Sequence, residues 1–286
     1  MLKQRVITAI VLLAILLPAL FYPSPAPFCL VALVLIAGGA WEWGKLNGCS
    51  QSQSLVLGVV SVVLCGAAWY AGLLTRPLPV LWILSGAAWV LVGAWLLRRG
   101  VAGWSRIPRS VRIPAGIFAL WLAWLAIAQA RVTGIPFLLS VLLLVWVADI
   151  FAYFAGRAFG GRFSKGKLAP AISPGKSWEG VWGGMAGVIV LAIVWALIER
   201  QSGIDGTASL YGRLWSRHGI LILLVAVIFM AAMSVVGDLV ESLIKRSAGA
   251  KDSSNLLPGH GGVLDRVDAL LPTLPLAMML INLPVL

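Results

Sequence analysis

The residues best suited to chemistry in this sequence lie between positions 238 and 268, where half of its 10 Asp and Glu residues are found. Asp238, Ser242 and Lys245 recur at a spacing of three to four residues, which places them on one stripe of a helix. Asp265 and Asp268 share a face in the same way. If the two segments are antiparallel neighbours, Asp238, Asp265 and Asp268 meet, and crowded carboxylates repel each other unless a cation neutralises them. Hard oxygen ligands favour Mg²⁺, so the spacing predicts a magnesium site formed by these three carboxylates.

Basic and glycine residues surround the same segment. The basic side chains are those of Lys245, Arg246, Lys251 and Arg266. The run 259–262 offers backbone N–H groups without side-chain obstruction, and we expect Gly261 and Gly262 to hold phosphate oxygens. His260 is either a phosphate contact or a turn residue. Salt-bridged loop ends are the alternative interpretation, but carboxylates, excess cations and a glycine turn together favour a metal–polyphosphate site.

A second group of polar residues lies upstream. Asp149 falls inside an apolar run, where an ionisable group costs roughly 2.5–3.5 kcal/mol and normally faces a cavity or a partner. Ser173, Lys176, Ser177 and Glu179 are packed around a Pro-Gly turn before another apolar run. Ser177 is placed to cap the helix that follows, and a helix N-terminus attracts anions. We therefore expect a phosphate contact here, although a cap alone is the alternative.

These residues must be positioned by membrane helices. Hydrophobic residues make up 60% of the chain and charged residues 11%, against about 25% charged residues in soluble domains. Apolar runs long enough to cross a bilayer recur along the chain. They predict an all-α polytopic bundle of about nine spans, near 6–22, 27–47, 54–74, 79–97, 112–130, 135–156, 179–198, 219–240 and 268–286. The first run resembles a signal peptide, but eight further spans favour an uncleaved helix.

The charge distribution predicts how these spans are oriented. Most of the 22 basic residues fall in alternate loops, which the positive-inside rule assigns to the cytoplasm together with the N-terminus. The loops 157–178 and 241–267 then face the cytoplasm. The net charge of +12 follows the membrane, so it gives no reason to expect a nucleic-acid partner.

One membrane domain, 1–286, is the simplest organisation, with scaffold helices in 1–134 and catalytic helices and loops in 135–286. In the scaffold, Glu42 lies three residues before Lys45, and we interpret them as a charge pair at a helix end. The pairs Gly180 and Gly184, and Gly183 and Gly187, predict close helix packing. The cysteines match no metal-binding pattern.

The stretch 242–268 reads SLIKRSAGAKDSSNLLPGHGGVLDRVD. It resembles the signature of the phosphatidate cytidylyltransferase family, also called CDP-diacylglycerol synthase, in which S-x-x-K-R precedes K-D and then P-G-H-G-G-x-x-D-R-x-D. The upstream segments DIFAYFAGRAFG and SPGKSWEG resemble further elements of that family. The resemblance covers most of the chain, and the first 130 residues are only weakly diagnostic.

The resemblance implies that phosphatidate and CTP react to give CDP-diacylglycerol and pyrophosphate, with Mg²⁺. It implies that the metal is held by Asp238, Asp265 and Asp268, and that the reacting phosphates are contacted by Ser242, Lys245 and Arg266. Phosphates of nucleotide or lipid would also meet Ser173, Lys176 and Ser177. Glu179 would orient a cation or a basic side chain, and Asp149 would support the cavity. A monovalent cation such as K⁺, a homodimer and a place in a bacterial cytoplasmic (inner) membrane are further implications.

Two other functions compete with this one. A CTP-dependent lipid-alcohol kinase would also need a metal–phosphate site, but it would release CDP instead of pyrophosphate. An anion transporter would account for Asp149 and the basic loops, but it leaves the ordered Asp, Lys, Arg and Gly motif without a reason. The helix pattern of CDP-alcohol phosphotransferases is not found in this sequence.

Overall fold

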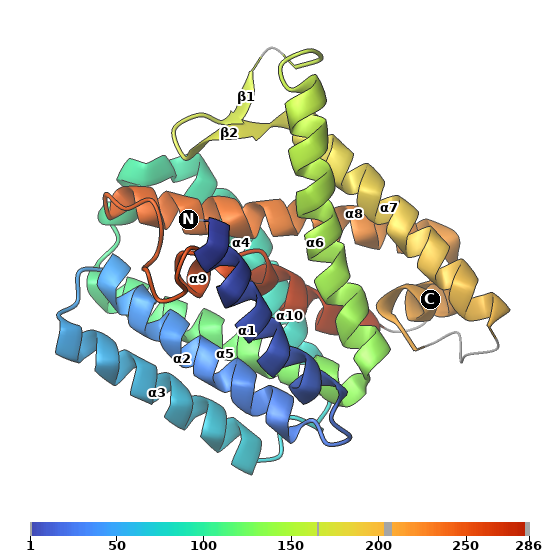
Figure 1. Ribbon diagram of the computed structural model, residues 1–286, viewed down its shortest axis with the longest axis horizontal. Coiled ribbons are helices and arrows are strands. Elements are labelled where there is room, and N and C mark those ends of the chain that lie inside the picture. The colour runs from blue at the N-terminus through green and yellow to red at the C-terminus, as the bar shows by residue number, and fades with distance from the viewer. Residues whose placement is uncertain (1, 165, 203–207, 284–286) are drawn as a thin grey trace.

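The computed structural model describes residues 2–164, 166–202 and 208–283 (Figure 1). Within these ranges the chain forms helices and one antiparallel pair of strands. The elements are α1 (Leu2–Phe21), α2 (Ala26–Leu46), α3 (Gln51–Tyr70), α4 (Pro79–Ser105), α5 (Arg109–Thr133), α6 (Ile135–Phe159), β1 (Lys167–Ala169), β2 (Ser173–Ser177), α7 (Trp178–Gln201), α8 (Leu210–Ser247), α9 (Leu264–Val267) and α10 (Leu270–Ile281).

The predicted all-α polytopic membrane bundle is confirmed. In the part of the chain that the structure describes, 8 helices are long and apolar enough to cross a membrane, and they correspond to the first eight predicted spans. The ninth predicted span, 268–286, contains α10, which has 12 residues. A helix of that length rises about 18 Å, which is less than the hydrocarbon core of a bilayer. Most of α10 is buried, and it packs against α4, α5 and α8.

The helices α6, α7 and α8 pack against one another. Asp149 lies on α6, Ser177 directly precedes α7, and Asp238 lies on α8. The glycines of α7 allow α6 to approach closely. A Cβ at Gly184 would lie 2.8 Å from the Ala148 carbonyl oxygen, and one at Gly180 would lie 2.9 Å from that of Ala152. The packing role predicted for the glycine pairs is therefore confirmed. Figure 1 shows the β1–β2 hairpin beside the end of α6, where the connection to α7 begins.

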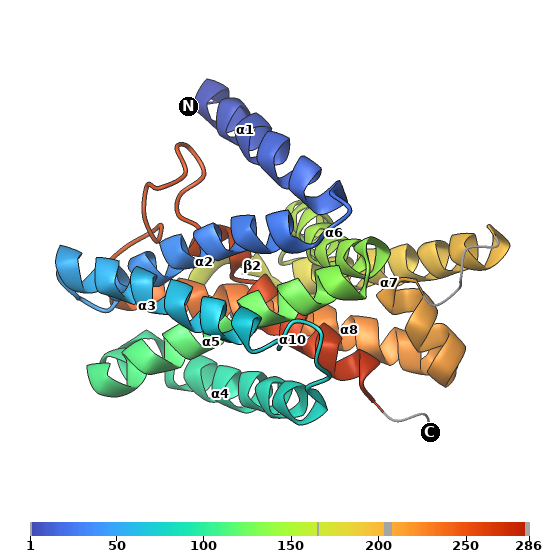
Figure 2. The same ribbon diagram turned by 90° about the horizontal axis from the view of Figure 1, so that it is seen from below.

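The helix α1 diverges from the rest of the bundle (Figure 2). It is held near its two ends. Close to its C-terminus, buried Arg131 of α5 donates hydrogen bonds to the carbonyl oxygens of Leu20 and Tyr22. Near its N-terminus, Arg5 donates to the Gly259 carbonyl oxygen over 2.9 Å. The first helix therefore contacts the glycine turn of the C-terminal motif.

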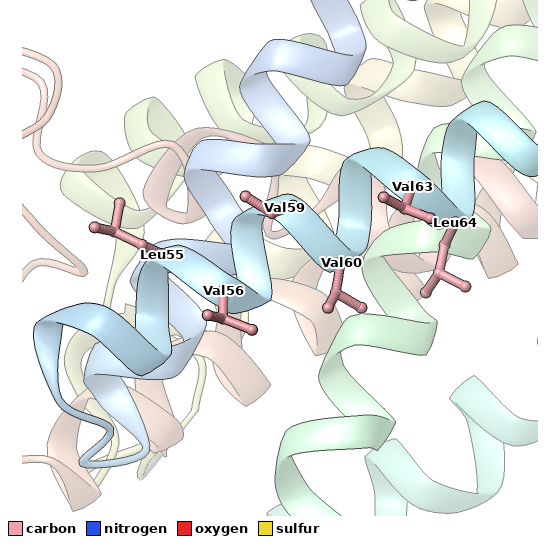
Figure 3. A pocket seen from close by; sticks show the side chains of 6 residues that line it. All are labelled: Leu55, Val56, Val59, Val60, Val63 and Leu64. Carbon is pink, nitrogen blue, oxygen red and sulfur yellow. The ribbon is translucent and has the colours of Figure 1, made fainter.

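The outer face of α3 is an aliphatic surface with a shallow hollow (Figure 3). Its lining consists of Leu55, Val56, Val59, Val60, Val63 and Leu64. Such a surface is suited to contact with lipid chains. It offers no group for chemistry, so the functional site must lie elsewhere.

Candidate active site

The two groups of polar residues that the sequence singled out meet at the C-terminal end of α8. Lys176 of β2 forms an ion pair with Asp238 of α8, and their side chains are 26% and 30% exposed. Ser242, one helical turn further along, donates a hydrogen bond of 3.2 Å to the other oxygen of Asp238. The predicted stripe on α8 and the turn before α7 therefore form one site.

A cavity of about 430 Å³ opens beside this ion pair, between α6, α7, α8 and β2. Its charged and hydroxyl-bearing lining residues are Asp149, Tyr153, Arg157, Lys176, Ser177 and Asp238. Small and apolar side chains complete the lining, among them Ala148, Met185, Ala231 and Val235. Asp149 lies within electrostatic range of Asp238 and Lys176. The prediction that Asp149 faces a cavity is confirmed.

Asp265 has a different set of partners from the one that its spacing predicted. One oxygen accepts from the Lys245 ammonium at 2.5 Å, and the other accepts from the backbone N–H groups of Ser253 and Gly262 at 2.9 and 2.7 Å. The Ser253 hydroxyl donates to that second oxygen as well. Burial by itself would raise the pKa of Asp265, but the hydrogen bonds from Lys245, Gly262 and Ser253 outweigh it and hold the pKa below its usual value.

Lys245 is similarly engaged. Its ammonium lies 2.5 Å from a carboxylate oxygen of Glu241 and 2.5 Å from one of Asp265. Its side chain is 12% exposed. Asp265 and Lys245 therefore neutralise each other in the wall of the site. In this structure, Asp265, the expected metal ligand, and Lys245, the expected phosphate contact, both point into the fold, because buried charges need partners.

Asp268 lies close to the cavity residue Asp238. Its Oδ1 accepts the N–H of Ala269 at 2.7 Å. Burial, followed by the nearby charge of Asp238, raises the pKa of Asp268 well above its usual range. A cation would relieve the repulsion between the two carboxylates, and oxygen donors of this kind suit Mg²⁺. Among the residues that the structure describes, no group of three or more potential ligands is arranged to hold a metal ion. The pair Asp238 and Asp268 fits a cation, and Asp265 does not join them.

The glycine turn 259–262 has its own structural requirements. Gly261 has a backbone φ of 82°, a conformation that favours glycine, and it bridges Leu257. A Cβ on Gly262 would overlap the Ser253 hydroxyl and the Glu42 carboxylate. The N–H groups of His260 and Gly262 donate within the protein, to Leu257 and Asp265. These two N–H groups are therefore not turned toward a phosphate, as the cradle predicted from the sequence would need.

The chain matches the model of the cytidylyltransferase family over residues 3–283. The chain belongs to this family. It is 39% identical over 279 residues to the phosphatidate cytidylyltransferase of Pseudomonas aeruginosa, covering 96% of this chain and 95% of the relative. It is 38% identical over 295 residues to that of Haemophilus influenzae, covering 96% of each chain, and 36% identical over 279 residues to that of Brucella abortus, covering 94% of this chain and 89% of the relative. The resemblance found in the motifs is confirmed, and the protein is a nucleotidyltransferase.

The remaining motif residues of this cytidylyltransferase connect its elements. Ser177 caps α7 by accepting the N–H of Gly180 at 3.2 Å, as predicted. Glu179 is buried, and one of its oxygens accepts from the N–H groups of Phe163 and Ser164 at 3.1 and 2.8 Å. It therefore holds the α6–α7 connection through one oxygen, and its expected role in orienting a cation or a basic side chain stays a prediction.

The basic residues beyond Lys245 differ in their contacts. Arg246 donates to the carbonyl oxygens of Ile172 and Ala250, which ties α8 to the hairpin. Arg266 donates two hydrogen bonds to the His260 carbonyl oxygen, at 2.9 and 2.7 Å. His260 therefore takes part in the turn through its backbone. Ser173 pairs with Ala169 at the start of β2, and Lys251 is exposed.

Glu42 has a role that the sequence did not predict. The expected pairing with Lys45 is wrong, since the Lys45 ammonium lies 4.5 Å from the centre of the Trp41 ring. Glu42 is fully buried and accepts hydrogen bonds from the C-terminal motif loop. Its depth in an apolar segment could have revealed this, because an ionisable residue at such a position calls for a partner. Arg157, which lines the cavity, was present in a quoted motif but was assigned no role.

Proposed function

We propose that this protein transfers CMP from CTP to phosphatidate, which forms CDP-diacylglycerol and releases pyrophosphate. The printed names of the relatives suggest phosphatidate as the acceptor. The observation that carries the proposal is the cavity between α6, α7 and α8, which combines charged side chains with an apolar wall. A lipid phosphate has the matching division between a dianionic head and apolar chains.

The lipid would lie with its phosphate near Arg157, Lys176 and Ser177. Arg157 and Lys176 supply positive charge, and the N-terminus of α7 beside Ser177 is a favourable place for an anion. The acyl chains would extend past Met185 and Val235 toward the bilayer. Lys176 carries three N–H donors, so it can keep its bond to Asp238 while it binds a phosphate oxygen.

The reaction needs alignment more than proton transfer. A phosphate oxygen of phosphatidate attacks the α-phosphorus of CTP, and the bond from that phosphorus to the bridging oxygen of the β-phosphate breaks. Pyrophosphate leaves with the electron pair. Because the attacking phosphate is already ionised, a general base contributes little. The protein lowers the barrier by holding two anions in line and by neutralising their charge.

The carboxylates of Asp238 and Asp268 are suited to hold Mg²⁺ for this reaction. A bound Mg²⁺ would supply charge neutralisation for the phosphates. We include in the proposal a site at the inner leaflet facing the cytoplasm, a homodimer, and a monovalent cation such as K⁺ beside the magnesium. The basic loops near the site support this orientation.

The test is to purify the protein in detergent and to measure pyrophosphate released from CTP, with and without phosphatidate, in Mg²⁺ or EDTA. Release that requires phosphatidate and Mg²⁺ and is lost in Asp238→Asn is the expected result. Formation of CDP with a lipid alcohol would favour a kinase. A folded, monodisperse preparation that releases no pyrophosphate would overturn the proposal.

A further inference from the structure

The short helix α9 carries the motif residues Asp265 and Arg266 and leads directly into Asp268. It has 4 residues, Leu264–Val267. A single turn is not stable by itself, because fixing its backbone dihedrals costs more than its few hydrogen bonds return. The N–H groups of its first turn also lack partners within the helix. The Val263 side chain at the N-cap cannot accept them.

Glu42 of α2 supplies those partners from a distant part of the chain. Its two carboxylate oxygens accept the N–H groups of Val263 at 2.9 Å and Leu264 at 2.8 Å. They also accept the hydroxyl groups of Ser253 at 3.1 Å and Ser254 at 2.5 Å. One buried side chain therefore fixes both the loop before α9 and the first turn of α9.

Charge and space both require a carboxylate at this position. The Glu42 side chain is 0% exposed, and the N–H groups of Val263 and Leu264 direct their positive ends toward it. A carboxylate accepts through both oxygens, whereas an amide accepts through one and donates from its nitrogen. The N–H groups of Val263 and Leu264 and the Ser254 hydroxyl donate to Glu42, while the single proton of the Ser253 hydroxyl is shared between Glu42 and Asp265. A glutamine would therefore turn its own N–H groups toward at least one of these donors. The missing side chain at Gly262 leaves the room that the carboxylate occupies.

We infer that Glu42 is a positioning residue for the reaction. It holds α9 so that Asp268, which directly follows this helix, stays beside Asp238. This inference rests on the proposed function for its catalytic consequence, but the structural part does not. Glu42 lies in the scaffold segment 1–134, and it supports the C-terminal motif.

The first experiment tests the contact itself, without any measurement of activity. Lys251 is exposed in the loop that Glu42 holds, and trypsin cleaves after lysine. In Glu42→Gln, we expect cleavage after Lys251 to become roughly tenfold faster or more, because at least two hydrogen bonds to a buried charge are lost. Cleavage at the exposed Arg98 and Arg99 serves as an internal reference and should not change.

The matched control is Glu199→Gln. Glu199 is also buried, at 5% exposed, and its carboxylate also accepts two side-chain donors, from Trp195 and Ser209. It lies at the opposite end of α7 from Ser177, away from α9. We expect this variant to leave cleavage after Lys251 unchanged. If Glu199→Gln accelerates that cleavage as much as Glu42→Gln does, general destabilisation is the cause and the inference fails.

The second experiment separates positioning from folding. Glu42→Gln that remains monodisperse should lose about 10²-fold in kcat for pyrophosphate release, with little change in KM for CTP, because misplaced groups act on the transition state more than on binding. Glu42→Asp keeps the charge and should recover part of the loss. A normal kcat in Glu42→Gln, with the loop released, would overturn the positioning role and leave the proposed function intact. No activity in the unmodified protein would instead count against the proposed function.

Discussion

Lys176 and Lys245 have opposite surroundings, and we predict opposite effects when each is replaced by methionine. The ion pair of Lys176 with Asp238 lies at the cavity, with side chains 26% and 30% exposed. Lys245 lies between Glu241 and Asp265, 2.5 Å from each, and those two side chains are 6% exposed. Methionine preserves most of the lysine stem, so each substitution mainly removes a charge.

The magnitudes follow from this difference in exposure. An ion pair that is open to water contributes about 0–1 kcal/mol, so Lys176→Met should change the free energy of unfolding by no more than about 1 kcal/mol. Removing one partner of a buried ion pair costs about 3–5 kcal/mol, because a charge is left uncompensated, and Lys245→Met should lose stability of this order. Activity should follow the reverse order. Lys176→Met should reduce kcat/KM by about 10²–10³, the cost of one group that stabilises transition-state charge.

The two quantities are measured on the same preparations. Unfolding in a titration of mixed micelles with a denaturing detergent gives the free-energy difference, and pyrophosphate release per folded protein gives kcat/KM. The reasoning is refuted if Lys176→Met unfolds the protein while its folded fraction retains activity. It is equally refuted if Lys245→Met is as stable as the unmodified protein but inactive, since Lys245 would then be the lysine that acts on the substrates.

Three further predictions test the cavity, the turn and the metal. Arg157→Gln should raise KM for phosphatidate by about 10-fold or more, because one hydrogen bond between charged groups is lost at the lipid end of the site, and KM for CTP should not change. Initial rates over a range of each substrate measure both values, and a rise in KM for CTP alone would contradict the prediction. Gly262→Ala should destabilise the protein by about 1–3 kcal/mol, because the added Cβ overlaps the Glu42 carboxylate, and an unaltered unfolding transition would contradict this packing. EDTA should abolish pyrophosphate release, and Asp268→Asn should need more Mg²⁺ for half-maximal rate than the unmodified protein; a variant with an unchanged Mg²⁺ requirement would exclude Asp268 as a ligand.

The sequence was sufficient to predict the membrane fold and the family. It also singled out residues that lie near one another in the structure. Hydropathy located the long helices because span length is set by the bilayer. Helical spacing placed Asp238 and Ser242 on one stripe, and they are hydrogen-bonded in the structure. Spacing could not determine that Lys176 would reach Asp238 from β2, because that contact depends on how the hairpin returns over α8.

The hydrogen-bond partners of each carboxylate could not be predicted from the sequence, for a physical reason. A carboxylate accepts several donors, and the donors that reach it come from backbone N–H groups whose positions depend on tertiary packing. Asp265 and Asp268 are equivalent by spacing, yet the loop 253–262 folds over Asp265 and supplies it with donors. Glu42 was missed for the same reason, since its partners lie more than two hundred positions away along the chain.

Four acids around the C-terminal motif divide into two groups by the number of donors that each one accepts. Glu42 and Asp265 are saturated by hydrogen bonds from the loop and from α9, and they fix backbone in place. Asp238 and Asp268 accept fewer donors and lie close enough to repel each other, so they retain capacity for a cation. The charge that this apolar chain concentrates near its C-terminal motif therefore has two roles, to fix the backbone and to leave carboxylates open to a cation. The first group holds the backbone around α9 in place, and under the proposed function the second group is the one that would bind the metal.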